Sequence, residues 1–282
     1  MDKVLEEFPY KNQIPCKAAA SPAANYLFMV KENTAKIGPR RKEIFHSTVA
    51  QLLFLSIWMR PNILMMVTFL CTRVKEPDED DWKKLIRVLG YLNGTRKLFL
   101  KIGIDDSNQM RFYADASFGV HKTYRSHIGG CMMMGTGCII SSSAKQKLNT
   151  KSSTEAELVA ADKISNILMW SKNFMECQGY AKEVVLYQDN KATRLLLENG
   201  KASSGKRTRY LNIRYFYLHG LIKKQLMKTE YCLMSDMIAD FFTKPLQAKH
   251  FSQLRAIIMD KNDKVRSVYM NTGVCWTYYY SM

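Results

Sequence analysis

Four acidic residues have the type and placement needed for chemistry on a phosphate: Asp115, Glu157, Asp189 and Asp240. Asp115 and Asp189 each end a short apolar or aromatic run that is typical of a buried strand, and ligand sites of α/β sheets gather beyond strand ends. Glu157 lies near the beginning of a predicted helix, and Asp240 interrupts an apolar run. No lysine partner is evident for these residues, so we expect partly buried carboxylates without a counter-charge.

Converging carboxylates repel one another unless cations neutralise them, and a set of oxygen ligands suits Mg²⁺ or Mn²⁺. Two such ions activate a water molecule, stabilise the leaving oxygen and so cleave a phosphodiester in line. The competing interpretation treats the same residues as helix caps and strand-end turns, as most aspartates are. Residue types and spacing alone leave both interpretations open.

Glu157 illustrates the two interpretations. Ser152 and Glu155 fit a capping box at the beginning of the helix, which would leave Glu157 free to point inward, but Thr154 and Glu157 fit the same pattern. Helical spacing favours the inward position, because Glu157 heads a stripe that continues with Ala161, Ile164 and Leu168. An unpaired carboxylate on such a stripe is costly unless it binds something.

The residues after position 109 predict the elements that position these acids. Strands are expected at residues 110–114, 129–134, 138–141, 183–188 and 227–233, and helices at 153–177, 192–198, 210–224 and 235–243. The first three strands have short connections, which implies antiparallel pairing. The mostly apolar fourth strand is typical of one covered on both faces.

The first part of the chain has a different pattern. Closely spaced prolines predict an extended lead-in over residues 1–45, and apolar spacing predicts helices over residues 46–104. Residues 50–71 are long and apolar enough for a membrane-spanning helix. Arg60 and Pro61 interrupt the middle of this segment, which favours two buried helices joined by a turn. We expect a domain boundary in the polar residues 103–109, a second domain over 105–259 and a tail of uncertain order over 260–282.

The net charge of the chain indicates the kind of partner that it binds. The 282 residues carry a net charge of +17, which suits a polyanion such as nucleic acid, although charge alone does not exclude an acidic membrane. Seven scattered cysteines and the absence of a signal-like N-terminus predict reduced thiols in an intracellular, cytoplasmic or nuclear protein. His121 and His127 follow Asp115 in a predicted loop near the substrate, but like the other histidines they have no metal-ligand spacing.

Four blocks of sequence resemble the ribonuclease H region of copia-type retrotransposon Pol polyproteins. These blocks are residues 113–117 (YADAS), 145–157 (KQKLNTKSSTEAE), 187–190 (YQDN) and 239–246 (ADFFTKPL). The resemblance implies an α/β fold with a ribonuclease H-like five-stranded mixed sheet flanked by helices. It also implies an endoribonuclease that hydrolyses the RNA strand of RNA–DNA hybrids with two Mg²⁺ or Mn²⁺ ions.

The resemblance assigns the metal-binding and catalytic roles to Asp115, Glu157, Asp189 and Asp240. Glu157 matches the family pattern better than Glu155. Asp240 is preferred because the family's last acid follows a small residue, and Asp236 is then expected to cap the last helix.

Upstream blocks resemble the thumb and connection that follow the reverse transcriptase palm: residues 45–54 (FHSTVAQLLF), 60–63 (RPNI) and 80–85 (DDWKKL). The palm itself has no counterpart here, so residues 46–104 are expected to be a small helical subdomain without polymerase activity. Three residues depart from the family pattern: Asn62, Tyr210 and Leu233. These departures leave open a catalytically inactive, truncated remnant that only binds nucleic acid.

A basic, tyrosine-rich segment follows the fourth strand and suits contact with a nucleic acid backbone. Together with the first acidic block it supplies the predicted nucleic-acid-binding residues: Ser117, Lys206, Arg207, Arg209 and Arg214. A merely solvated basic face remains the alternative. The expected partners are an RNA–DNA hybrid and a reverse transcriptase palm in a parent polyprotein, with no membrane.

Overall fold

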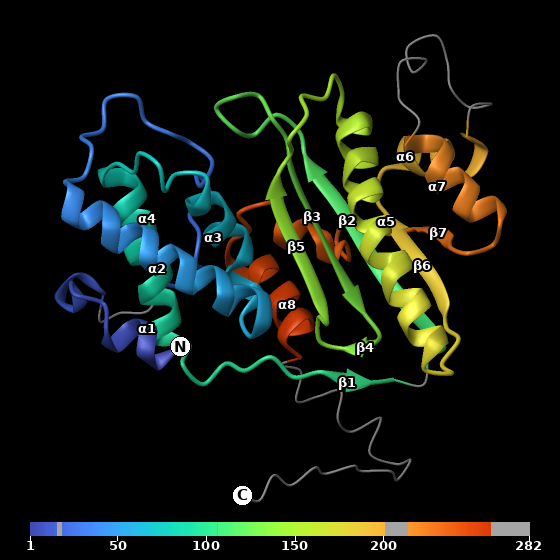
Figure 1. Ribbon diagram of the computed structural model, residues 1–282, viewed down its shortest axis with the longest axis horizontal. Coiled ribbons are helices and arrows are strands. Elements are labelled where there is room, and N and C mark those ends of the chain that lie inside the picture. The colour runs from blue at the N-terminus through green and yellow to red at the C-terminus, as the bar shows by residue number, and fades with distance from the viewer. Residues whose placement is uncertain (16–18, 106, 201–213, 261–282) are drawn as a thin grey trace, which may run out of the picture.

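The computed structural model describes residues 1–15, 19–105, 107–200 and 214–260 (Figure 1). Its helices are α1 (Asp2–Glu6), α2 (Pro39–Trp58), α3 (Leu64–Cys71), α4 (Glu79–Gly94), α5 (Ser153–Cys177), α6 (Lys191–Asn199), α7 (Arg214–Lys223) and α8 (Ala248–Met259). Short 3-10 helices include η1 (Lys11–Gln13), η2 (Pro61–Ile63) and η4 (Ile238–Phe242). The strands are β1 (Gly103–Ile104), β2 (Gln109–Ser117), β3 (His127–Met133), β4 (Gly135–Thr136), β5 (Ile140–Lys145), β6 (Glu183–Gln188) and β7 (Lys228–Tyr231).

The centre of the fold is a five-stranded mixed sheet in the order β5-β3-β2-β6-β7. The locally connected strands β2, β3 and β5 pair antiparallel, whereas β6 is parallel to β2 and β7 is parallel to β6. The chain therefore runs through a meander, the long helix α5, a parallel strand, two helices and a last parallel strand. This confirms the predicted fold class, an α/β fold with a five-stranded mixed sheet flanked by helices.

Helices cover the two faces of this sheet. Apolar side chains of α5, α6 and α7 form one core with alternate residues of β2, such as Phe112 and Ala114. Tyr113, which points to the other face of β2, belongs to a second core with η4 and α8. Two adjacent glycines in β3 allow close approach on both faces: a Cβ at Gly129 would lie 2.6 Å from Phe242 Cβ, and one at Gly130 would lie 2.5 Å from Ile164 Cδ1.

The helical half precedes the sheet in sequence and lies beside β5 (Figure 1). The predicted turn at Arg60 and Pro61 is present, because α2 ends at Trp58 and η2 begins at Pro61. Asn62, one of the departures from the family pattern, is buried and donates a hydrogen bond to Tyr91 Oη at 2.7 Å. Among the described residues, no helix combines the length and the apolar character that a membrane span requires.

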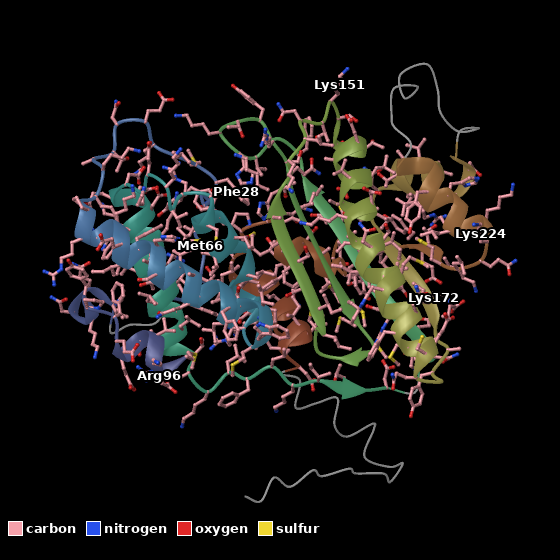
Figure 2. The ribbon with its side chains drawn as sticks, in the orientation of Figure 1. Phe28, Met66, Arg96, Lys151, Lys172 and Lys224 are labelled. Atoms are coloured by element: carbon pink, nitrogen blue, oxygen red, sulfur yellow. The ribbon has the colours of Figure 1, made fainter. Side chains whose placement is uncertain are left out.

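The N-terminal residues are more structured than an extended lead-in. Helix α2 begins at Pro39, and Leu5, Phe8 and Leu27 are buried against the helical half. Phe28 lies between this half and the sheet (Figure 2), with ring centroids 5.8 Å from Phe69 of α3 and 5.0 Å from the imidazole of His127. The prolines do prevent long helices here, but burial of apolar side chains still orders the segment.

One core joins both halves of the chain. It contains buried side chains of α2, α3 and α4 together with η4 and α8, so residues separated by well over a hundred positions share it. The polar residues expected to separate two domains also make contacts: β1 pairs with β4, and the Lys101 amide donates to Met259 O. The division of the chain at residues 104 and 105 stays a prediction.

Three local expectations were wrong near the C-terminal end. Residues 238–242 form a 3-10 helix, not the middle of a longer helix, because a short tight turn packs Phe242 directly against β3. Asp236 does not cap it: Met237 precedes η4, and the Asp236 carboxylate accepts from Ser235 Oγ. Helix α8, with Phe251, Leu254 and Ile258 buried, was not predicted.

Candidate metal centre

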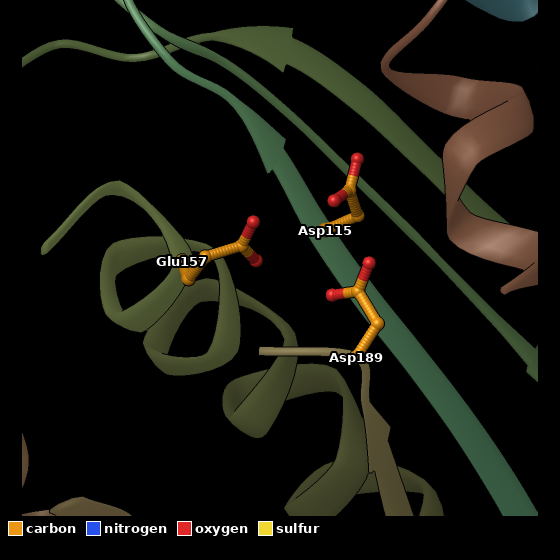
Figure 3. A group of neighbouring side chains, drawn as sticks. All are labelled: Asp115, Glu157 and Asp189. Atoms are coloured by element: carbon orange, nitrogen blue, oxygen red, sulfur yellow. The ribbon is translucent and has the colours of Figure 1, made fainter. Parts of the chain in front are cut away.

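Three of the four predicted acids meet at one edge of the sheet. Asp115, Glu157 and Asp189 each offer a carboxylate oxygen, and these atoms all lie within 4.8 Å of one another. Figure 3 shows the three carboxyl groups pointing toward a common space from β2, from α5 and from the residue after β6. The structure thus brings together residues that are up to 74 positions apart, the separation between Asp115 and Asp189.

Strand register places the two aspartates side by side. Strands β2 and β6 are parallel neighbours, and Tyr113 is paired with Tyr187. Asp115 and Asp189 each lie two residues farther along, so both reach the same edge of the sheet. The tyrosine rings below them stack with centroids 4.9 Å apart, which fixes this end of the strand pair.

The beginning of α5 orients Glu157. Ser152 is the N-cap residue and its Oγ accepts from the Glu155 amide at 3.1 Å, while the Glu155 carboxylate accepts from the Lys151 amide. Capping is therefore done by Ser152 and Glu155, and the alternative cap by Thr154 and Glu157 is wrong. Glu157 is 6% exposed, and its Oε2 has no hydrogen-bond partner among the described residues.

Lys244 links Asp240 to the acidic cluster by ion pairs with both Asp240 and Asp115. The Lys244 ammonium lies 2.6 Å from Asp240 Oδ1 and 3.6 Å from Asp115 Oδ1, and Thr243 Oγ1 donates to the other oxygen of Asp115. The expectation that no lysine partners these carboxylates was wrong. The signal for Lys244 was present in the sequence, because residues four apart on a helical turn are neighbours.

Burial and mutual repulsion raise the pKa of several of these acids. Desolvation raises the pKa of Glu157 well above its ordinary value, and the charges of Asp115 and Asp189 raise it further. Desolvation, with the charge of Asp115, raises the pKa of Asp240 to about 7, although the Lys244 ammonium opposes the shift. The pKa of Asp189 is raised by the same two causes in the same order. The protein thus holds negative charge here at a cost that a cation would offset.

The residues present fit a hard divalent cation. All the donors are carboxylate oxygens, which Mg²⁺ and Mn²⁺ prefer over nitrogen or sulfur. Two oxygens on opposite sides of Mg²⁺ are about 4.2 Å apart, so side chains whose oxygens lie within 4.8 Å need only a small inward movement. The buried, unpaired Oε2 of Glu157 is a ready ligand atom.

The predicted nucleic-acid-binding residues are only partly located. Ser117 ends β2 and its Oγ donates to Thr243 O at 3.0 Å, which places it beside the acidic cluster. Arg214 begins α7. The remaining three, Lys206, Arg207 and Arg209, lie outside the described residues.

The two histidines after Asp115 are packed residues. His121 Nε2 and His127 Nδ1 are 3.0 Å apart, and His127 Nε2 lies 2.7 Å from Ser143 Oγ, which donates to Phe242 O. Burial lowers the pKa of His127 to about 3 and that of His121 to about 4. Both are therefore neutral and link β3 and β5 to η4, the element that carries Asp240.

Sequence comparison finds homologues among transposon proteins. The chain is 26% identical over 264 residues, 92% of its length, to the retrovirus-related Pol polyprotein from transposon TNT 1-94 of Nicotiana tabacum. It is 29% identical over 245 residues to the corresponding protein from transposon RE2 of Arabidopsis thaliana, and 29% over 260 residues to that from transposon RE1. These three homologues are Pol polyproteins from copia-type transposons, and the chain spans only 19%, 16% and 17% of their lengths. No family model matches the chain.

Structure comparison returns ribonuclease H domains. LC11-RNase H1, isolated from compost by a metagenomic approach, is 13% identical, with a TM-score of 0.36 over 55% of this chain and 97% of that one. The same enzyme in complex with an RNA/DNA hybrid gives a TM-score of 0.35 at 11% identity over 47% of this chain and 92% of that one.

Proposed function

We propose that this homologue of transposon Pol polyproteins is a ribonuclease H that hydrolyses the RNA strand of RNA–DNA hybrids. The observation that carries the proposal is the convergence of Asp115, Glu157 and Asp189 at one edge of the sheet, with oxygens within 4.8 Å of one another. Such a cluster, with two buried carboxylates and one half-buried, has no structural purpose of its own, because its members destabilise one another. Its arrangement suits divalent cations and a phosphodiester.

The four acidic residues would hold two metal ions between them. Asp115, Glu157 and Asp189 would hold one ion, and Asp115 with Asp240 would hold a second. The ions supply Lewis-acid stabilisation of the charge that develops on the phosphate oxygens. The register of β2 and β6 fixes the two aspartates before any ion binds, so little reorganisation is needed during the reaction.

Lys244 keeps Asp115 and Asp240 together before a second ion arrives. Its ammonium contacts both carboxylates, and its side chain is 34% exposed, which leaves it room to move away. Ser117, whose Oγ donates to Thr243 O at the end of β2, would contact the sugar of the cleaved strand. A 2′-hydroxyl contact is the means by which a protein separates RNA from DNA at such a position.

The test is hydrolysis of a hybrid with a labelled RNA strand, in Mg²⁺, by the full chain and by Asp189→Asn. We expect cleavage by the full chain and a loss of at least a hundredfold in the variant, because electrostatic stabilisation of this kind contributes factors of about 10² to 10³. Equal cleavage by the two proteins would exclude the assignment. Salt-sensitive binding without any Mg²⁺-dependent cleavage would favour the alternative, an inactive nucleic-acid-binding remnant.

A further inference from the structure

A pocket adjoins the acidic cluster on the side of Lys244. Its volume is about 670 Å³, within the range of small-molecule sites. It is lined by parts of three segments, residues 25–30, 117–124 and 243–245. Lys244 lines this pocket and also contacts Asp115 and Asp240, so the pocket opens directly beside the carboxylates. The first segment belongs to the N-terminal part of the chain, outside the sequence blocks that resemble a ribonuclease H.

The N-terminal wall of the pocket is firmly held. Leu27 is buried, Phe28 packs edge-on against His121 with ring centroids 5.0 Å apart, and Lys84 Nζ donates to Met29 O at 2.8 Å. These contacts fix the backbone from both halves of the molecule. Tyr26, which directly precedes these fixed residues, nevertheless leaves half of its surface exposed at the pocket.

The opposite wall carries a second exposed tyrosine. Tyr124 is 83% exposed and has a φ of 56°, a left-handed conformation that is unfavourable for a tyrosine. A tight turn holds it there, because its amide donates to His121 O at 2.7 Å and the buried His121 is anchored on His127. Non-glycine residues held in this conformation concentrate at ligand sites.

The lining of the pocket suits a nucleotide. Tyr26 and Tyr124 supply ring faces on which a base stacks, a contact that every base can make. Lys122 supplies positive charge, the charge of Lys244 is shared with Asp115 and Asp240, and the described residues that line the pocket include no carboxylate. Glu32 pairs with Lys122 from outside at 3.1 Å, but both side chains are exposed, so this ion pair is weak.

We propose that this pocket binds an unpaired nucleotide of the strand whose phosphodiester lies at the acidic cluster. The inference rests on the proposed function for the position of that phosphodiester. It assigns the N-terminal segment a part in substrate choice: hybrids with a single-stranded extension next to the cleaved region bind better than blunt ones.

The experiment measures binding of hybrids to the full chain carrying Asp189→Asn, in which cleavage is not expected. Two hybrids are compared, each with a short single-stranded extension of the RNA strand: one carries it at the 5′ end and the other at the 3′ end. The extension contains 2-aminopurine as the reporter base, and a blunt hybrid serves for comparison. Stacking on tyrosine quenches 2-aminopurine. We expect quenching with one of the two extensions, and a loss of affinity of about tenfold for that hybrid when Tyr26→Ala and Tyr124→Ala are combined. Affinity for the blunt hybrid should be unchanged.

Two further pairs of substitutions control for folding and for exposed aromatic rings in general. Tyr26→Phe with Tyr124→Phe keeps the ring faces and should retain the affinity. Trp170→Ala with Tyr180→Ala removes two exposed rings and should have no effect: Trp170 lies roughly 20 Å along α5 from Glu157, and Tyr180 lies three residues beyond the end of that helix.

The outcomes separate this inference from the proposed function. No quenching with either extension, or equal losses for extended and blunt hybrids, would overturn the pocket assignment even if the wild-type chain cleaves hybrids. Quenching that depends on Tyr26 and Tyr124, in a wild-type chain that cleaves nothing, would uphold the pocket and overturn the nuclease.

Discussion

At the scale of single residues, the Lys244 ammonium stabilises the carboxylates of Asp115 and Asp240 when no metal ion is bound. We expect Lys244→Gln to lower the free energy of unfolding of the metal-free protein by about 1 to 2 kcal/mol, because two buried carboxylates lose their shared cation. Chemical unfolding in a chelator measures this. The same variant should be stabilised more by Mg²⁺ than the wild type, since no ammonium competes with the ion.

Lys3→Gln is the matched control for that experiment. Lys3 also forms an ion pair with an acid four residues away, Glu7, but both of these side chains are largely exposed. Its removal should change the free energy of unfolding by no more than about 0.5 kcal/mol. Equal losses in the two variants would mean that Lys244 is an ordinary surface lysine.

The raised pKa of Asp240 predicts a pH dependence. Burial and the charge of Asp115 raise this pKa to about 7 from an ordinary 3.8, so between these values the folded protein keeps a proton that the unfolded chain has lost. The free energy of unfolding of the metal-free protein should therefore fall as the pH rises from about 4 to 7, by at most about 1.4 kcal/mol per pH unit for this group. Urea unfolding at several pH values measures the slope.

Asp240→Asn should remove much of this slope, and Glu157 and Asp189 contribute to the remainder because their pKa values are raised as well. Asp236→Asn, at an exposed acid four residues earlier, should leave the slope as it is. A slope that is the same in Asp240→Asn and in the wild type would contradict the assignment of the shift to Asp240.

The sequence was sufficient to find the acids but not their cation. Asp115 and Asp189 follow strand-like runs, and the parallel pairing of β2 and β6 brings both to one edge, as strand ends in α/β sheets do. The spacing of four residues indicates the pair of Lys244 with Asp240, but the helix predicted over 235–243 does not indicate the tight turn of η4. Only the packing of that tight turn against β3 shows that Lys244 points back at Asp115.

At the scale of elements, the beginning of α5 sets the direction of Glu157. Ser152→Ala should cost about 1 kcal/mol of stability, since Ser152 Oγ accepts from the Glu155 amide. Thr154→Ala, two residues later and inside the helix, should cost much less. Thermal unfolding of both variants tests the capping assignment, and an equal or larger loss in Thr154→Ala would contradict it.

The secondary structure was predictable where apolar residues recur at a regular helical or strand spacing. The bounds of α5 and β6 agree with their predicted residues, because apolar spacing and clear breaks define both. Helix α8 was not predicted although Phe251, Leu254 and Ile258 follow helical spacing, because no N-cap side chain marks its beginning after Pro245. The pairing of β1 with β4 joins two-residue strands, which are too short to have any pattern.

At the scale of the whole molecule, the helical half and the sheet share a core, so we expect them to unfold together. Hydrogen exchange of the full chain should give the same free energy of opening for amides of α4 and of β2, because η4 and α8 pack against both halves. A clearly lower value for α4 would show that the two halves are independent domains.

The shared core could not be deduced from the sequence. The composition changes near residue 105, which favours two domains, and nothing in local patterns shows that η4 and α8 return to the helical half. Contacts between residues far apart in sequence have no periodic signal. Gly129 and Gly130 allow η4 and α5 to approach β3 closely, but the sequence does not indicate that β3 lies between these two elements.

The shared core also has a consequence for the order in which the protein folds during synthesis. Helices α2, α3 and α4 leave the ribosome first, but α8, which completes their core, ends only at Met259. Contacts across such long separations form slowly, and at about 5 to 20 residues per second the helices remain with apolar surface exposed for roughly 8 to 33 seconds. We therefore expect the nascent chain to be open to chaperones until α8 has been made.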